Sequence, residues 1–147
     1  MKTVRGLLNE KGSVVWSTTP NSLVFDALEQ MDEKNVGALL VLEGEKLVGI
    51  MSERDYARKV ILKGKCSRDI LVKDIMTYNV ISVNPDQTVH ACLKLISDKH
   101  VRHLPVVQDD KVIGIVSIGD LVNAIIAEQK TLIQRLEQFI LENKSLT

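Results

Sequence analysis

The sequence predicts an α/β (α+β) fold in which two β-α-β-β-α repeats pack about a pseudo-twofold axis, followed by an extended C-terminal helix. The main observation is a stretch that occurs twice: residues 49–55 read Gly-Ile-Met-Ser-Glu-Arg-Asp, and 65 positions later residues 114–120 read Gly-Ile-Val-Ser-Ile-Gly-Asp. A chain of 147 residues is too short for two independent cores, so the repeats are expected to share one. The same offset relates further pairs, among them Pro20 and Pro85, Val24 and Val89, Leu39 and Leu104, and Lys46 and Lys111.

The elements of repeat 1 follow from the periodicity of its apolar residues. Helical spacing after Pro20 predicts a helix that ends near Asn35. Two mostly apolar runs then flank a glycine-containing turn, which predicts a hairpin buried on both faces. The expected elements are a brief strand at 14–15, a helix from Ser22 to near Asn35, strands at 38–42 and 46–51, and a helix from Arg54 to about Lys63, with the same order in repeat 2.

The chain divides into four segments on this basis. Repeat 1 with an N-terminal arm takes residues 1–63, a polar linker takes 64–78, repeat 2 takes 79–127, and a helical extension takes 128–147. In the last helix Leu132, Leu136 and Phe139 recur at three-four spacing, and Ile133 and Ile140 form an adjoining row. This apolar stripe continues well beyond the length of the equivalent helix in repeat 1. The extension is therefore expected to be covered by its own fold or by another chain.

Composition excludes several classes of function. Nineteen Lys and Arg balance nineteen Asp and Glu, and aromatic residues make up 3%, so nucleic acid is not an expected partner. No signal region or membrane span is recognisable, and Cys66 and Cys92 lack metal-ligand spacing, so they are expected to be free thiols. These features predict a cytoplasmic protein without membrane contact.

The repeated stretch ends a strand and begins a helix, and it permits two interpretations. Ser52 with Asp55, and Ser117 with Asp120, have the spacing of a capping box. The same groups suit a ligand, because N–H groups and a hydroxyl at a helix start bind an anion while a carboxylate accepts from a ribose diol. The sequence leaves both interpretations open.

The doubled pattern resembles the tandem cystathionine-β-synthase (CBS) domain pair, often called a Bateman module, in a stand-alone, bacterial-type protein. The resemblance runs from about Val14 to Ile126. The matching motifs are Gly-x-x-Ser-x-x-Asp in both repeats, Asp74-Ile-Met-Thr77, the run 80–85 leading into Thr88-Val89, and the run 103–107. The resemblance implies adenine-containing ligands such as AMP, ADP, ATP or NAD in clefts between the repeats.

The resemblance also implies two sets of ligand-binding residues, each combining parts of both repeats. Repeat 2 has Arg102-His103 where repeat 1 has Gly37-Ala38, so the two clefts are not expected to be equivalent. The first set is Lys11, Ser13, Val36, Gly37, Ala38, Ser117 and Asp120, and the second is Ser52, Arg54, Asp55, Thr77, Val80, Val101, Arg102 and His103.

The function expected on these grounds is that of a non-catalytic sensor with an adenine nucleotide as regulatory ligand, no catalytic cofactor and no metal. We expect a homodimer and leave room for an unidentified protein that it regulates. The alternative is a scaffold or partner-regulating module in which one or both clefts are vestigial. An enzyme is not expected, because the sequence lacks a nucleophile elbow, a HExxH motif and a P-loop.

Overall fold

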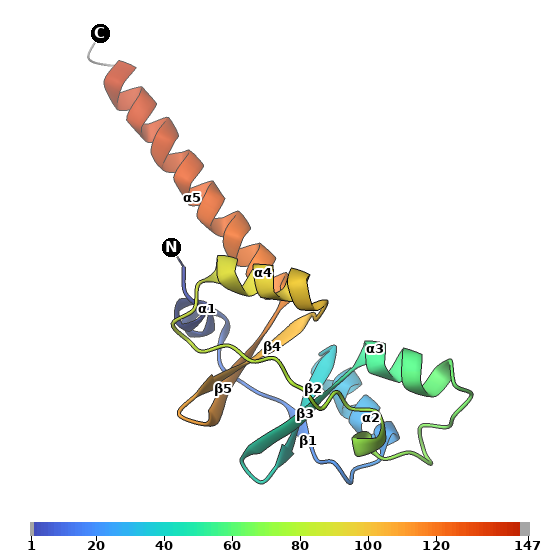
Figure 1. Cartoon of the computed structure of the whole chain (residues 1–147). Helices are drawn as coiled ribbons and strands as arrows, with labels where there is room; N and C mark the ends of the chain where they lie inside the picture. The colour runs from blue at the N-terminus through green and yellow to red at the C-terminus, as the bar shows by residue number, and fades with distance from the viewer. Residues whose placement is uncertain (1, 145–147) are drawn as a thin grey trace.

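Each half of the chain is a β-hairpin with helices packed beside it in the computed structural model, which describes residues 2–144 (Figure 1). Both hairpins are antiparallel, and each has one register irregularity, after Val41 in repeat 1 and after Val106 in repeat 2. The 65-residue repeat therefore extends to details of the backbone. The hairpin strands are β2 (Ala38–Glu43) and β3 (Lys46–Ser52) in repeat 1, and β4 (His103–Gln108) and β5 (Lys111–Ser117) in repeat 2.

The first long helix of each repeat also ends in the same way. Helix α2 (Val24–Lys34) is followed by Asn35 at φ 52°, and α4 (Val89–Lys99) is followed by His100 at φ 56°. Both residues are left-handed, a conformation that Asn and His adopt more readily than most residues. The predicted end of the first helix near Asn35 is confirmed.

The first strand of each repeat differs from the prediction. In repeat 1 it is β1 (Ser17–Thr18), parallel to β2, and the expected strand residue Val14 is instead exposed. In repeat 2 the equivalent pairing shrinks to one bridge, between Val83 and Val106. The register of the partner strand, which sets Ser17 beside Leu40, decides which residues pair, and the apolar character of residues 14–15 does not.

The buried side chains form two clusters, one in each repeat, in place of the single shared core that chain length suggested. Each cluster is completed by a segment that directly precedes the other repeat in the chain. Helix α1 (Val4–Lys11) packs Val4, Leu7 and Leu8 into the cluster of repeat 2. The segment 64–78, which includes the short helix η2 (Val72–Asp74), packs Ile70, Val72, Ile75 and Met76 into the cluster of repeat 1.

The repeated glycines allow these two segments to approach the sheets. A Cβ atom at Gly49 would stand 2.6 Å from Sδ of Met76, and one at Gly114 would stand 2.7 Å from Cδ2 of Leu8. Real Cβ atoms do not approach other atoms so closely. Glycine recurs at this place because the N-terminal arm and the linker each cross a strand there.

The second helix of repeat 1 is shorter and wider than predicted. Helix α3 (Glu53–Tyr56) continues as the π-helical turn η1 (Ala57–Ile61), in which the Leu62 N–H donates to the Ala57 carbonyl at 3.0 Å. Its counterpart α5 (Ile118–Lys144) is one helix of 27 residues that projects far from the body (Figure 1). The predicted C-terminal extension is therefore helical as far as the structure describes it.

Candidate functional site

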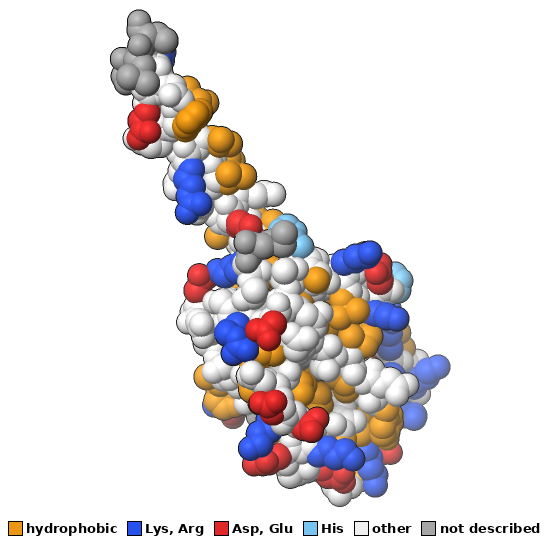
Figure 2. Space-filling model, turned by 60° about the vertical axis from the view of Figure 1, so that its left-hand side comes forward, with side chains coloured by type: hydrophobic (Ala, Val, Ile, Leu, Met, Phe, Trp, Pro, Cys, Tyr) orange, Lys and Arg blue, Asp and Glu red, His pale blue; other side chains and the backbone are white. Residues whose placement is uncertain are grey.

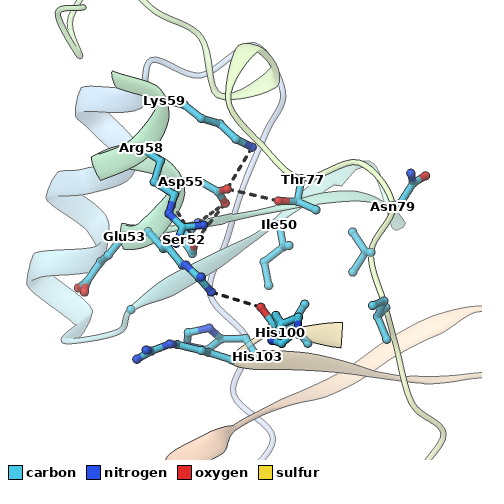
Figure 3. Close-up of a pocket in the computed structure, with 16 residues that line it drawn as sticks. Ile50, Ser52, Glu53, Asp55, Arg58, Lys59, Thr77, Asn79, His100 and His103 are labelled. Carbon is cyan, nitrogen blue, oxygen red and sulfur yellow. Dashed lines mark hydrogen bonds and ion pairs between the residues drawn. The ribbon is translucent and has the colours of Figure 1, made fainter. Parts of the chain in front are cut away.

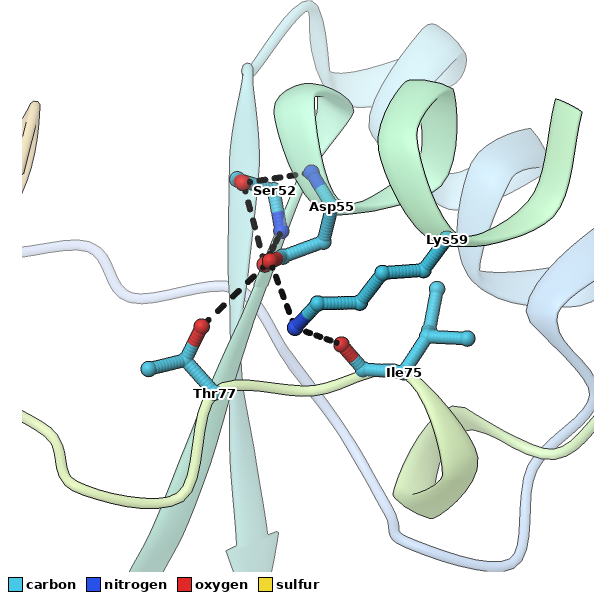
Figure 4. Close-up of polar contacts among 5 residues, drawn as sticks. All are labelled: Ser52, Asp55, Lys59, Ile75 and Thr77. Atoms are coloured by element: carbon cyan, nitrogen blue, oxygen red, sulfur yellow. Dashed lines mark hydrogen bonds and ion pairs between the residues drawn. The ribbon is translucent and has the colours of Figure 1, made fainter. Parts of the chain in front are cut away.

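The turn from β3 into α3 holds the carboxylate of Asp55 by a complete capping box. The Ser52 N–H donates to Oδ2 of Asp55 at 3.1 Å and the Ser52 hydroxyl donates to the same oxygen at 3.0 Å, while the Asp55 N–H donates to Oγ of Ser52 at 3.1 Å (Figure 4). The capping interpretation of the repeated motif is therefore confirmed for this turn. It fixes the carboxylate at the start of the helix.

The other oxygen of Asp55 is engaged by two residues outside the turn. Oδ1 lies 3.1 Å from Nζ of Lys59 and accepts from the Thr77 hydroxyl at 3.3 Å (Figure 4). Lys59 also donates to the Ile75 carbonyl at 2.8 Å, so it ties η1 to the linker. A carboxylate has about four acceptor positions, and these contacts use all of them. A ribose diol could bind Asp55 only by displacing Thr77 or Lys59.

The turn from β5 into α5 repeats the cap but has a different neighbour. The Ser117 N–H donates to Oδ2 of Asp120 at 2.9 Å, and the Asp120 N–H donates to Oγ of Ser117 at 3.1 Å. Nζ of Lys11, at the end of α1, lies 2.9 Å from the same Oδ2 and donates to the Ile115 carbonyl at 2.7 Å. Burial raises the pKa of Asp120, but the bonds from Lys11 and Ser117 outweigh it and hold the pKa below its ordinary value.

A pocket of about 630 Å³ lies between the repeats in front of the Asp55 turn (Figure 3). This volume is within the range of small-molecule sites. Four side chains that carry a permanent positive charge line it, and two carboxylates accompany them. The lining residues are Gly37, Ile50, Ser52, Glu53, Arg54, Asp55, Arg58, Lys59, Thr77, Asn79, Val80, Ile81, His100, Val101, Arg102 and His103.

The structure brings together the whole second set of sequence-predicted site residues. All eight line this pocket, with Ser52, Arg54 and Asp55 supplied by repeat 1. Opposite them lie Arg102 and His103 from the start of β4. The guanidinium of Arg54 donates to the His100 carbonyl at 3.2 Å, which joins the repeats across the pocket.

The first set is divided. Lys11, Ser117 and Asp120 meet in the ion pair and cap described above, whereas Ser13 is exposed. Gly37 lines the pocket of the second set, and Ala38 is buried in β2. Two backbone groups expected to contact adenine already have hydrogen-bond partners. The Val36 N–H donates to the Met31 carbonyl, and the Gly37 carbonyl accepts from the Glu53 N–H.

His103 lies at the border between the two predicted sites. A Cβ atom at Gly37 would stand 3.7 Å from the His103 ring, an ordinary van der Waals distance, so the imidazole packs directly beside the Gly37 position. Burial lowers the pKa of His103 below 6.5, although the carboxylates of Asp120 and Glu53 act in the opposite direction. The ring is therefore held mainly neutral near pH 7.

Sequence reasoning missed several residues of this pocket. Arg58 and Lys59 follow Asp55 by three and four positions, which places them over the same helix face. That spacing was a usable signal. Asn79 and His100 gave no such signal in the sequence, because their position in space depends on how the linker and the end of α4 are folded.

Three further features bear on the classes of function. Within residues 2–144, no group of three or more His, Cys, Asp or Glu side chains is arranged to hold a metal ion. The described helices include none that combines the length and the apolar character needed to cross a bilayer. Cys66 is exposed and Cys92 is buried, both as free thiols.

A family model described as CBS domain matches residues 13–62 and 72–127. Among curated proteins, the chain is 43% identical over 134 residues to the mitochondrial CBS domain-containing protein CBSX3 of Arabidopsis thaliana; the match covers 88% of this chain and 65% of CBSX3. The chain thus spans less than two thirds of that relative.

Solved structures of similar proteins agree over most of the chain. The CBS domain protein NE2398 is 50% identical, with a TM-score of 0.82 and coverage of 85% of this chain and 98% of that one. CBSX2, solved with AMP, is 28% identical with a TM-score of 0.70, covering 88% of this chain and 99% of that one. The MJ0100 domain pair, solved with 5-methylthioadenosine and S-adenosyl-L-methionine, is 25% identical with a TM-score of 0.78. The match covers 87% of this chain and 98% of that one.

Proposed function

The chain belongs to the CBS domain family, and from this premise we propose that it is a sensor that binds an adenine nucleotide in the pocket between its repeats. CBS domain pairs are generally regulatory rather than catalytic modules. The observation that carries the proposal is the pocket lined by Asp55 on one repeat and Arg102 on the other. A ligand that contacts both repeats changes how they sit relative to each other, which is the output of a sensor.

The charges of the pocket favour a phosphate-bearing ligand. Arg54, Arg58, Lys59 and Arg102 outnumber Glu53 and Asp55, and one carboxylate, Asp55, is already paired with Lys59. Guanidinium groups beside a helix N-terminus bind phosphate oxygens well. AMP, as bound by CBSX2, fits this chemistry better than the sulfonium ligand S-adenosyl-L-methionine that MJ0100 binds.

The remaining parts of the ligand have complementary surfaces in the same pocket. Ile50, Val80, Ile81 and Val101 supply apolar surface for a purine ring. Asp55 supplies a carboxylate for the ribose diol once Thr77 or Lys59 moves aside. The proposal therefore requires a local exchange of hydrogen bonds at Asp55 when the nucleotide binds.

A thermal-shift series tests the proposal. At about a hundred times its dissociation constant, AMP should stabilise the protein by about 2.7 kcal/mol, and GMP and S-adenosyl-L-methionine should stabilise it less. Arg102→Gln should remove most of the AMP shift, whereas Lys111→Gln at the β4–β5 turn should keep it. No shift with AMP, ADP, ATP or NAD would overturn the proposal.

The second candidate is a scaffold in which the clefts are vestigial. The full engagement of Asp55 and the ion pair between Lys11 and Asp120 favour it, because both carboxylates already have partners within the chain. The same thermal-shift series separates it from the sensor. The cytoplasmic location and a regulated partner protein stay predictions, and the relative CBSX3 is named as mitochondrial.

We also propose that the chain assembles as a homodimer. The support is the long apolar surface of the projecting part of α5, which nothing in residues 2–144 covers.

A further inference from the structure

The projecting part of α5 presents a stripe of large apolar side chains to solvent. We call Leu132, Ile133, Leu136, Phe139 and Ile140 the apolar stripe; each is between 52% and 62% exposed. Apolar side chains run along one side of the projecting helix in Figure 2, with charged ones beside them. Continuous apolar surface of this kind is uncommon on a soluble monomer and marks an interaction site.

The stripe continues toward the body. Ile118, Val122 and Ile126, on the same side of α5, are also 40% to 44% exposed. Leu121 and Ile125, on the neighbouring rows of the same side, pack into the core of repeat 2, so the side is fully open only in the projecting part of the helix. A partner helix has room to lie beside α5 over several turns.

The charged residues beside the stripe form two opposite rows. With about 100° per residue, Leu136 lies at the centre of the stripe, Leu132 and Phe139 lie on one side, and Ile133 and Ile140 lie on the other. Beyond Leu132 and Phe139 stand Glu128, Arg135 and Glu142, seven positions apart, and beyond Ile133 and Ile140 stand Lys130, Glu137 and Lys144. Every charge in one row is opposite in sign to the charge two positions away in the other.

We propose that α5 pairs with α5 of a second copy as a parallel coiled coil centred on Leu136. In a parallel twofold pair, each row faces the other row of the partner at nearly the same height, because two positions rise only about 3 Å along the helix. Arg135 then faces the partner's Glu137, and Glu142 faces the partner's Lys144, whereas Oε2 of Glu128 is buried and lies 4.0 Å from Nε2 of His90 in its own body. Both contacts between the subunits join opposite charges.

An antiparallel pair fails the same test. A twofold axis perpendicular to the helices sets each row against its own copy. Glu128 would then lie near the partner's Glu142, Lys130 near the partner's Lys144, and Arg135 near the partner's Arg135. Every flanking contact would join like charges, which is destabilising. For a pair centred on Leu136, the charge pattern thus selects the parallel orientation.

Polar residues in the line of Leu136 support this register. Gln129 and Asn143 stand seven positions before and after Leu136, so in a parallel pair each meets its own copy. Polar side chains at such positions fix the register of parallel coiled coils, because a shift would bury them against apolar neighbours. An isolated charge row or apolar row would not specify register in this way.

The inference rests on the homodimer proposed above, and charge reversal tests the two separately. We expect the full-length protein to sediment as a dimer at micromolar concentration, and a monomer would overturn both proposals. Arg135→Glu should raise the dissociation constant about tenfold, since two attractive contacts per dimer become repulsive. Glu137→Arg should do the same, and the double variant R135E/E137R should restore dimerisation to about the original strength.

A dimer unaffected by the single reversals would overturn the parallel register while keeping the homodimer, because antiparallel contacts remain like-charged in every variant. Cysteine cross-linking gives an independent measure of orientation. In a Cys66→Ser background, Gln129→Cys should form a disulfide-linked dimer on mild oxidation, and Gln134→Cys, on the outer side of the helix, should not. The absence of a Gln129→Cys disulfide would contradict the parallel pairing.

Discussion

The two strand-to-helix turns have the same cap and different surroundings. Ser52 with Asp55, and Ser117 with Asp120, make the same reciprocal bonds at 2.9 to 3.1 Å. In front of Asp55 lies a pocket lined by both repeats, whereas Asp120 is paired with Lys11. Identical motifs in a tandem repeat therefore do not imply identical sites.

The differences trace to residues at equivalent positions of the repeat. The 65-residue offset puts Ala124 where Lys59 stands, and Gly12 where Thr77 stands. Asp120 thus lacks the two outside partners of Asp55, and Lys11 supplies a substitute from α1. The segments that precede each repeat, together with substituted positions within the repeats such as Lys59 and Ala124, distinguish the two sites.

The largest expected effect comes from the two glycines beneath these segments. Gly49→Val should destabilise the protein by about 3 kcal/mol and Gly114→Val by about 1 kcal/mol, the range for overpacking. Gly49 is more sensitive because its new side chain would also meet the Thr77 carbonyl, at 3.1 Å from the Cβ position, whereas Gly114 meets only the flexible Leu8 side chain. Urea unfolding measures both, with Gly6→Ala as control. Equal losses would contradict the distinction.

A smaller effect is expected from the two lysines that pair with the aspartates. Lys59→Met should cost about 1 to 2 kcal/mol, because it removes the charged partner of the largely buried Asp55 carboxylate and the donor to the Ile75 carbonyl. Lys11→Met removes the corresponding ion pair and the donor to the Ile115 carbonyl, and it should cost less, about 0.2 to 1 kcal/mol, because the Asp120 side chain is 28% exposed and that of Asp55 only 14%. Thermal unfolding of the two variants compares them directly, and a greater loss for Lys11→Met would show that the tighter network is at Asp120.

The smallest effect is a pH dependence that belongs to one repeat alone. His103 has a lowered pKa in the folded protein, and Ala38 is its counterpart in repeat 1. Below pH 6.5 the unfolded chain binds a proton that the folded chain still excludes, so stability should fall as pH decreases from 7.5 through 6.5 toward the lower folded pKa.

His103→Gln should flatten this dependence, as measured by urea midpoints at several pH values. His90→Gln controls for the loss of an imidazole from a half-exposed side chain. An unchanged slope in the His103 variant would assign the dependence to other groups.

Much of the fold and of the two strand-to-helix turns could be predicted from the sequence, because local patterns determine them. The hairpins, the ends of α2 and α4 and the two caps follow from short motifs and their repetition, and the family resemblance implied the residues facing Asp55. The partner of Asp120 could be predicted only in part: Lys11 was expected opposite it as a ligand contact, and the structure pairs the two side chains directly.

The rest depends on tertiary packing. Strand β1 forms at Ser17–Thr18 because β2 pairs there, and each core is completed by a segment whose sequence looks like a connection. The residues 64–78 are mostly polar, and their four buried side chains, at positions 70, 72, 75 and 76, are too irregularly spaced to give a periodic signal. The hydrogen bond from Thr77 to the Asp55 carboxylate follows from that packing.

Calorimetric titration with AMP tests the central claim, that the pocket at Asp55 is the nucleotide site and the turn at Asp120 is not. The wild type should bind one AMP per chain. Asp55→Asn should weaken binding roughly tenfold to a hundredfold, as expected for the loss of hydrogen bonds to a charged group. Asp120→Asn should leave the affinity within about twofold. Two equal sites per chain, or loss of binding in Asp120→Asn with retention in Asp55→Asn, would contradict the account.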